Sequence, residues 1–203
     1  LEMAYNLGFG SSQEFGRGLS TSPGLLPEPS ALENTRALAN FSFGQGDLTV
    51  TPMQVAGMIN TIASGGKYSS LKLIEGTADQ ELNVTPVQSA QEKAIQVLEH
   101  STAKRLQNYL ESAASSGTGR AGAPSSCASG IKTGTAQTGI YENGEELLHF
   151  WYTGYISDGT GPKYTITVLR ESTPDDYGMA AKVFQEIGEG ISQLRFSPET
   201  PKE

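Results

Sequence analysis

Residues 132–135 read Lys-Thr-Gly-Thr, and their types and spacing suit chemistry on a bound substrate. Lys132, Thr133 and Thr135 offer one charged and two hydroxyl donors, which can replace the hydration of an anion such as a carboxylate. They lie within residues 128–137, a predicted strand of small residues that suits a sheet edge approached closely by a ligand. The pattern is short. Taken alone, it fits an ordinary solvated strand with a surface lysine better than a binding site.

Residues 101–104 read Ser-Thr-Ala-Lys, which is the Ser-x-x-Lys spacing of a serine nucleophile and its lysine base. Such a lysine must be desolvated to lose its proton near neutral pH. The residues that follow Lys104 are mostly polar, and Arg105 supplies positive charge without burial. We therefore expect Ser101 to be the N-cap of a helix over residues 101–115 rather than a nucleophile.

His100 and His149 are the only histidines, and no cluster of metal-ligating residues surrounds either in the sequence. The sequence therefore predicts no metal site, and no motif in it indicates a cofactor. Cys127 is the single cysteine, so no internal disulfide can form. Because no base lies near Cys127 in the sequence, a small structural residue explains it better than a reactive thiol.

The length and charge of the chain exclude several classes of function. Its 203 residues are enough for one domain with a sizeable core. A net charge of −8 argues against nucleic-acid binding, which needs clustered lysine and arginine. No apolar run approaches the ~18 residues of a membrane span. Residues 1–20 also lack the apolar core of a signal peptide.

Residues 51–54 predict the start of a helix. Thr51 suits an N-cap, Pro52 suits the first turn, and Gln54 completes a capping box. Apolar residues then recur at helical spacing and predict one buried stripe: Val55, Met58, Ile59, Ile62 and Ala63. The preceding Gly-Gln-Gly at residues 44–46 could line a groove or could be the turn that leads into the helix. The residues alone favour the turn.

Alternating apolar residues predict strands over 148–156 and 163–170, joined by a hairpin loop, and a shorter strand over 71–74. A last helix carries an apolar stripe, and residues 197–203 are expected to form a disordered tail. Because neighbouring strands are joined by a hairpin and a helix follows them, the predicted fold class is α+β, with an antiparallel sheet packed with helices. The stripe of the last helix consists of Met179, Val183, Phe184, Ile187 and Ile191.

Three blocks of the chain resemble the transpeptidase domain of class B penicillin-binding proteins. Lys-Thr-Gly is the third active-site motif of that family, and the Ala-Gln that follows it here is similar to class B members. The second block is Gly-Gln-Gly with the following Thr-Pro, at residues 44–52. The third is the glycine-rich loop of residues 8–29. The resemblance implies a partial penicillin-binding transpeptidase/β-lactamase-like fold, with residues 1–196 as the C-terminal part of the domain.

The resemblance also implies roles for residues 132–135. Lys132 would supply positive charge near the substrate carboxylate and the proton network. The hydroxyls of Thr133 and Thr135 would bind that carboxylate, and the backbone N–H of Thr135 would be one donor of the oxyanion hole. Gly134 has no side chain, so the substrate could lie against the strand as an added β-strand.

Neighbouring positions receive roles in the same way. Gln137 and Thr138 would lie at the rim of the substrate site. Trp151 and Tyr152 would pack beneath the active-site strand. Two of the five strands in the family's sheet precede the nucleophile, so the sheet of this chain should be incomplete. We expect apolar surface to be left uncovered and available for self-association. The candidates to lie near this surface are Phe41, Phe43 and Met58.

The family's Ser-x-x-Lys nucleophile and its Ser-x-Asn motif would lie upstream of Leu1. The resemblance therefore implies a fragment, inactive alone, of a D,D-transpeptidase of peptidoglycan synthesis. The parent protein would act on peptidoglycan stem peptides and bind β-lactams on the extracytoplasmic face of the bacterial membrane. Two alternatives stay open: a D,D-carboxypeptidase or β-lactamase-type serine hydrolase, and a non-catalytic binding module.

Overall fold

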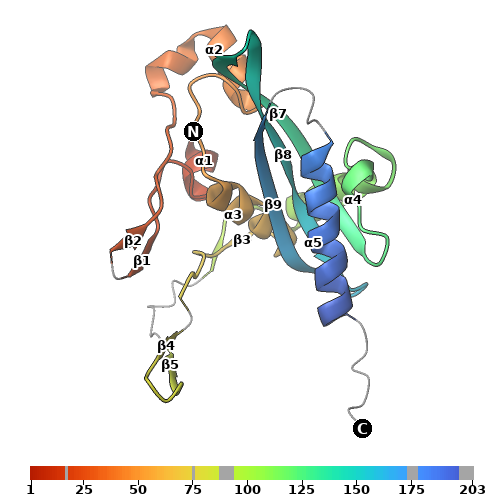
Figure 1. The fold of residues 1–203 in the computed structure, drawn as a ribbon. Coiled ribbons are helices and arrows are strands. Elements are labelled where there is room, and N and C mark those ends of the chain that lie inside the picture. The colour runs from red at the N-terminus through yellow and green to blue at the C-terminus, as the bar shows by residue number, and fades with distance from the viewer. Residues whose placement is uncertain (17, 75, 87–93, 173–177, 197–203) are drawn as a thin grey trace.

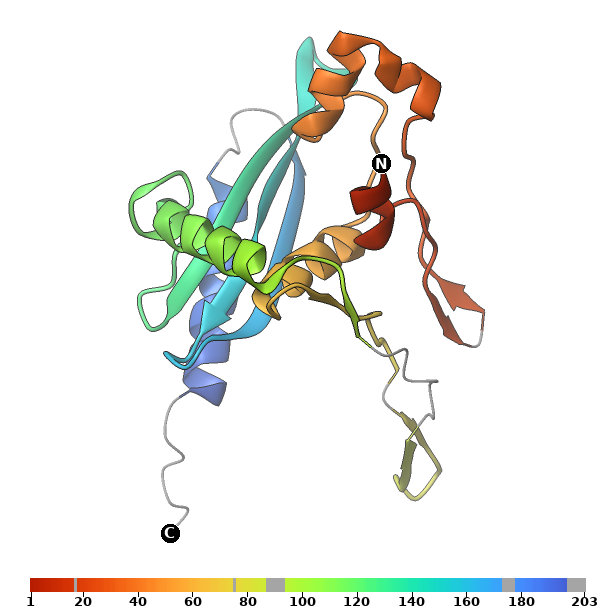
Figure 2. The ribbon, with the colours of Figure 1, turned by 180° about the vertical axis from the view of Figure 1, so that it is seen from behind.

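The computed structural model describes residues 1–16, 18–74, 76–86, 94–172 and 178–196. Its centre is an antiparallel sheet in the order β7–β8–β9 (Figure 1). Helix α5 covers one face of this sheet, and α3 and α4 cover the other (Figures 1 and 2). The predicted α+β class is therefore confirmed. The bounds are Ala128–Glu142 for β7, Glu145–Ser157 for β8, Pro162–Ser172 for β9, Pro52–Ala63 for α3, His100–Ser116 for α4 and Met179–Arg195 for α5.

Strands β7 and β8 form one long hairpin that extends beyond the predicted strand over 128–137. Its turn is Asn143-Gly144, with φ angles of 52° and 87°. Two successive positive φ angles are the mark of a type I′ turn, whose twist matches that of the flanking strands. The register shifts between Gln137 and Tyr141, where the strand bulges. Because of the bulge, the hairpin tip keeps its pairing although the simple alternation stops at residue 137.

Two hydrophobic cores lie on opposite faces of the sheet. The core beneath α5 is centred on Ile131 and Phe184, which are fully buried. The stripe predicted for α5 is wrong in part, since Met179 and Ile187 are exposed while the small residues Ala180 and Ala181 face the sheet. Small residues let the helix approach the sheet closely. The second core, beneath α3 and α4, consists of Ile59, Ile62, Leu110 and Tyr155.

Helix α3 begins as the sequence predicts. The Thr51 hydroxyl accepts a hydrogen bond from the Gln54 backbone N–H at 3.2 Å, and the Gln54 side chain accepts one from the Thr51 N–H at 2.9 Å. These reciprocal bonds complete the capping box. Val55, Ile59 and Ile62 are buried, which confirms the centre of the predicted stripe.

The N-cap of helix α4 is Glu99, two residues before the predicted cap. The prediction that Ser101 is the N-cap is wrong: Ser101 lies exposed in the first turn. The helix also crosses the edge of the sheet, because Leu110 belongs to the core beneath α3 and Ala114 to the core beneath α5. The buried Gln107 donates to the Ile62 carbonyl at 2.8 Å, which ties α4 to the end of α3.

The predicted strand over residues 71–74 is wrong. The pairing occurs instead between β3 (Lys67–Tyr68) and β6 (Ile95–Gln96). The Gly66 carbonyl accepts hydrogen bonds from the N–H groups of Val97 and Leu98. These bonds join the segment that follows α3 to the segment that precedes α4, so the pairing lies N-terminal to residue 71. The hairpin of β4 (Gly76–Ala78) and β5 (Val84–Pro86) projects from the body of the molecule (Figure 1).

The remaining elements precede α3 or connect α4 to the sheet. An antiparallel β1–β2 hairpin lies within the predicted loop of residues 8–29. The predicted tail, residues 197–203, lies outside the described residues. The bounds are Glu2–Asn6 for α1, Glu14–Gly16 for β1, Leu19–Ser20 for β2, Pro29–Glu33 for η1, Thr35–Ser42 for α2 and Arg120–Gly122 for η2.

Candidate active site

The Lys-Thr-Gly-Thr residues lie in the regular part of β7, in continuous register with β8. Lys132 pairs with Thr153, Thr133 with Tyr152, Gly134 with Trp151 and Thr135 with Phe150. Because successive side chains of a strand point to opposite faces, Lys132 and Gly134 share one face of the sheet, and the two threonines share the other. The lysine and the two hydroxyls can meet one ligand only at the free edge of β7.

The free edge of β7 presents outward-facing backbone groups. Among the described residues, β7 pairs with β8 alone. The Thr135 carbonyl accepts a hydrogen bond from Gln45 Nε2 at 3.4 Å, and the Thr133 carbonyl accepts one from Lys132 Nζ. Neither donor belongs to β8, so both carbonyls point away from it. The N–H and C=O of one strand residue point to the same side. The Thr135 N–H therefore faces outward too, as an oxyanion donor requires.

Packing within the chain does not require glycine at position 134. A Cβ built on Gly134 would meet Trp151 Cβ at 3.4 Å, which is an ordinary contact. Gly130 lies four residues earlier on the same face of β7, and there the packing does require glycine. A Cβ built on it would lie 2.5 Å from Cζ of the buried Tyr155. The fold thus explains Gly130. No contact within the described residues requires glycine at position 134.

Gln137 and Thr138, predicted at the rim of the site, make hydrogen bonds within the hairpin. Gln137 Nε2 donates to Glu146 Oε2 at 3.2 Å. The Thr138 hydroxyl donates to the Leu147 carbonyl at 2.5 Å and accepts from the Ile140 N–H at 3.1 Å. These bonds stabilise the bulge of the hairpin. Both residues follow the motif directly along β7.

Gln45 comes from a distant part of the sequence, 90 residues before Thr135. The structure places it beside the motif strand, so the groove interpretation of Gly-Gln-Gly gains support over a turn alone. Both glycines have positive φ, 86° at Gly44 and 79° at Gly46, and this tight geometry brings the glutamine side chain to the edge of β7.

Thr118 is the neighbour of the motif that sequence reasoning missed. The Thr133 hydroxyl donates to Thr118 Oγ1 at 3.0 Å. Thr118 lies in the Gly-Thr-Gly turn that ends α4, a segment to which no functional role was assigned from the sequence. A hydroxyl between two glycines shortly before the motif strand is the signal that could have drawn attention to it.

Tyr152 anchors that turn from below. Its hydroxyl donates to the Gly119 carbonyl and accepts from the Gly122 N–H at 2.8 Å. Its ring packs against Phe184 with a centroid separation of 5.3 Å. Tyr152 is 5% exposed and pairs with Thr133 in the sheet, which places it next to the motif strand, in the core beneath α5. Trp151 lies beside Gly134.

The Ser101 and Lys104 side chains lack the surroundings that a nucleophile and its base need. Both are exposed, and Lys104 Nζ bonds to Gln107 Oε1 at 3.5 Å. An exposed ammonium keeps its hydration, and burial is what would favour its neutral form. This geometry supports the prediction that Ser101 is not the nucleophile.

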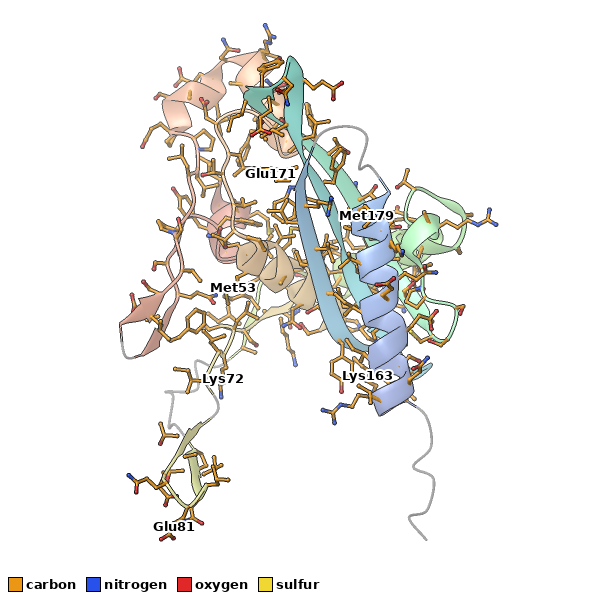
Figure 3. The ribbon with its side chains drawn as sticks, in the orientation of Figure 1. Met53, Lys72, Glu81, Lys163, Glu171 and Met179 are labelled. Atoms are coloured by element: carbon orange, nitrogen blue, oxygen red, sulfur yellow. The ribbon has the colours of Figure 1, made fainter. Side chains whose placement is uncertain are left out.

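The other polar and sulfur-bearing candidates have structural surroundings. His149 Nε2 lies 2.6 Å from Glu171 Oε2, near the opposite end of β9 from Lys163 (Figure 3). Partial burial raises the pKa of the Cys127 thiol, which argues against a reactive thiolate. Within the described ranges, no group of three potential metal ligands occurs, and no helix is long and apolar enough to cross a membrane.

A shallow pocket of about 390 Å³ lies between η1, α2 and the Gly46–Asp47 turn. Its lining residues include Arg36 and Phe41 and none of the residues predicted for the site. This pocket is therefore separate from the candidate site at the free edge of β7.

Comparison with known proteins identifies a family and several relatives that resemble this chain. A family model described as the penicillin binding protein transpeptidase domain matches residues 2–189. Penicillin-binding protein PbpB of Mycolicibacterium smegmatis is 28% identical over 93% of this chain and 32% of its own length. Peptidoglycan D,D-transpeptidase FtsI of Buchnera aphidicola is 28% identical over 96% of this chain and 33% of its own length. The chain thus spans about a third of the length of these relatives.

Solved structures agree with this match. A peptidoglycan synthetase from Bifidobacterium adolescentis superposes with a TM-score of 0.80 and 27% identity, over 98% of this chain and 36% of that one. Penicillin-binding protein 3 from Mycobacterium tuberculosis, solved in complex with ampicillin, gives a TM-score of 0.79 at 24% identity, over 99% and 46%. At that identity the second likeness shows the fold alone. With the family match over residues 2–189, this chain belongs to the penicillin-binding protein transpeptidase domain family.

Proposed function

We propose that this chain is the C-terminal part of the transpeptidase domain of a class B penicillin-binding protein, with residues 1–196 forming that part. The parent protein cross-links peptidoglycan stem peptides on the extracytoplasmic face of the membrane, and β-lactams acylate it. The observation that carries the proposal is the free edge of β7, where outward-facing backbone groups of Thr133 and Thr135 lie beside a lysine and two hydroxyls.

The substrate adds to this edge as a further strand. Backbone carbonyls at Thr133 and Thr135 accept its N–H groups, and Gly134 leaves room for it to lie flat. Lys132 and the threonine hydroxyls then surround the substrate carboxylate with charge-assisted hydrogen bonds. Lys132 Nζ donates to the Thr133 carbonyl, and substrate binding exchanges that bond for one to the carboxylate.

Acyl transfer needs a nucleophile, which we place on a serine outside these 203 residues. That serine attacks the carbonyl of the D-Ala-D-Ala bond, and a lysine one helical turn later accepts its proton. The terminal D-alanine leaves, and an amine of a second stem peptide then takes the acyl group. The Thr135 N–H faces the free edge and stabilises the oxyanion formed in each step.

Two other activities would use the same strand. A D,D-carboxypeptidase or β-lactamase transfers the acyl group to water, so product analysis with an added amine acceptor separates it from a transpeptidase. A non-catalytic binding module forms no acyl-enzyme at all.

The test is covalent labelling by a fluorescent penicillin, compared between the full-length parent and the isolated 203-residue chain. We expect a stoichiometric, boiling-resistant label on the parent and none on the chain alone. Ser101→Ala in the chain is the matched control. A label on the isolated chain that this change removes would make Ser101 the nucleophile. An unlabelled parent would leave only the binding-module alternative.

A further inference from the structure

The Gly117-Thr118-Gly119 turn carries a hydroxyl that contacts the motif strand but has no assigned role. Thr118 Oγ1 lies 3.0 Å from Thr133 Oγ1, and this bond joins two residues separated by 15 positions. Thr118 is exposed, so its hydroxyl needs no protein partner to satisfy it. The contact therefore calls for an explanation other than the burial of a polar group.

The turn is held rigidly against the sheet. The N–H groups of Gly117 and Gly119 both donate to the Ala113 carbonyl, which fixes the end of α4. The Gly119 carbonyl accepts from the Tyr152 hydroxyl. A Cβ built on Gly119 would lie 2.9 Å from Ile131 Cβ, so the turn rests directly on the strand that carries the motif.

Because the turn is held rigidly, the Thr118 hydroxyl has a fixed position beside the Thr133 hydroxyl. A threonine hydroxyl has one donor and two acceptor positions, and its proton turns to suit the partners present. In the structure, Thr133 donates to Thr118. When an anion accepts the Thr133 proton, Thr118 can reverse and donate to Thr133. A hydroxyl that accepts one hydrogen bond while donating another is polarised and donates more strongly.

We propose that Thr118 is a positioning residue for substrate binding, which orients the Thr133 hydroxyl toward the substrate carboxylate and strengthens its donation. Thr118 itself acts through Thr133. The inference rests on the proposed function, because it needs a carboxylate-bearing substrate at the free edge of β7.

The expected effect follows from the loss of one hydrogen bond in the relay. Thr118→Val keeps the size and β-branching of the side chain and removes only the hydroxyl. The second-order rate of acylation of the full-length parent by benzylpenicillin should fall about three- to tenfold. Thr118→Ser keeps the hydroxyl and should restore the rate. Because Thr118 is exposed, the melting temperature of the Thr118→Val protein should equal that of the unaltered protein.

The decisive comparison uses benzylpenicillin methyl ester, which lacks the carboxylate. Thr118→Val should leave acylation by the ester within twofold of the unaltered protein, whereas a merely structural change would slow both compounds alike. In a Thr133→Val background, Thr118→Val should have no further effect on benzylpenicillin. Thr85→Val, an exposed threonine on the projecting β4–β5 hairpin, is the matched control and should acylate normally (Figure 1).

Equal loss with both compounds, an unaltered rate in Thr118→Val, or additive effects with Thr133→Val would each overturn the inference while leaving the transpeptidase proposal intact. Failure of the unaltered parent to acylate would instead refute the proposed function, and this inference with it.

Discussion

Gly134→Ala separates a binding strand from an ordinary surface strand. The added methyl would lie 3.4 Å from Trp151 Cβ, an ordinary contact that requires no movement. Alanine in a strand is also favoured over glycine by about 0.5–1 kcal/mol, because glycine loses more backbone freedom on folding. The free energy of unfolding should therefore stay the same or rise by up to that amount.

Binding should respond in the opposite way. A Cβ on Gly134 would project from the face of β7 that Lys132 shares, so the methyl occupies space that a substrate group covering this face would need. Forcing a methyl into a close-packed contact costs about 1–3 kcal/mol. That cost corresponds to roughly a five- to 150-fold lower acylation efficiency. The assay is the second-order acylation rate of the full-length parent with one penicillin, with thermal unfolding measured on the same preparation.

Gly130→Ala provides the matched control on the same face of β7. Its Cβ would lie 2.5 Å from Cζ of Tyr155, whose hydroxyl is held by Glu111 Oε1 at 3.0 Å. The ring cannot move freely, so this change should destabilise the fold by about 1–3 kcal/mol. If Gly134→Ala keeps full stability and acylates within twofold of the unaltered protein, no ligand lies against this strand and the argument from Gly134 fails.

Three further outcomes are expected. In the full-length parent, Lys132→Ala and Thr133→Val should each lower the acylation rate about ten- to a hundredfold, from the loss of roughly 1.5–3 kcal/mol of charge-assisted hydrogen bonding, with circular dichroism as the check on folding. Ser101→Ala should leave acylation unchanged and shift the unfolding free energy by less than about 0.5 kcal/mol, since Glu99 is the N-cap; loss of acylation with the fold intact would contradict this. The isolated 203-residue chain should self-associate in sedimentation experiments through apolar surface that includes Phe43, which is 69% exposed; a monomer with a sharp, high melting transition would argue against it.

The sequence by itself determined the elements whose signals are local. The capping box of α3 needs only Thr51, Gln54 and the proline between them, and the structure forms it as predicted. Strands β8 and β9 follow from alternation within short windows, because a half-buried strand must place every second residue inward. The strand that carries Lys-Thr-Gly-Thr, and its place at a sheet edge, were predicted instead from its small residues. The Asn143-Gly144 turn was present in the sequence as a signal but was not used.

The tertiary structure alone decided which distant residues join the motif. Glu99 displaces Ser101 as the cap of α4, and Gln107 enters a buried position because it can bond to the end of α3. Helix α4 crosses the edge of the sheet, and this crossing brings Thr118 to Thr133.

Gln45 reaches Thr135 across 90 residues. Such contacts depend on how packed elements cross, and no local window of sequence carries that information. Contacts between distant elements also explain two predictions that were wrong, the strand at residues 71–74 and the apolar stripe of α5. There, a glycine closing against a distant segment and a close helix–sheet approach outweighed local hydrophobic pattern.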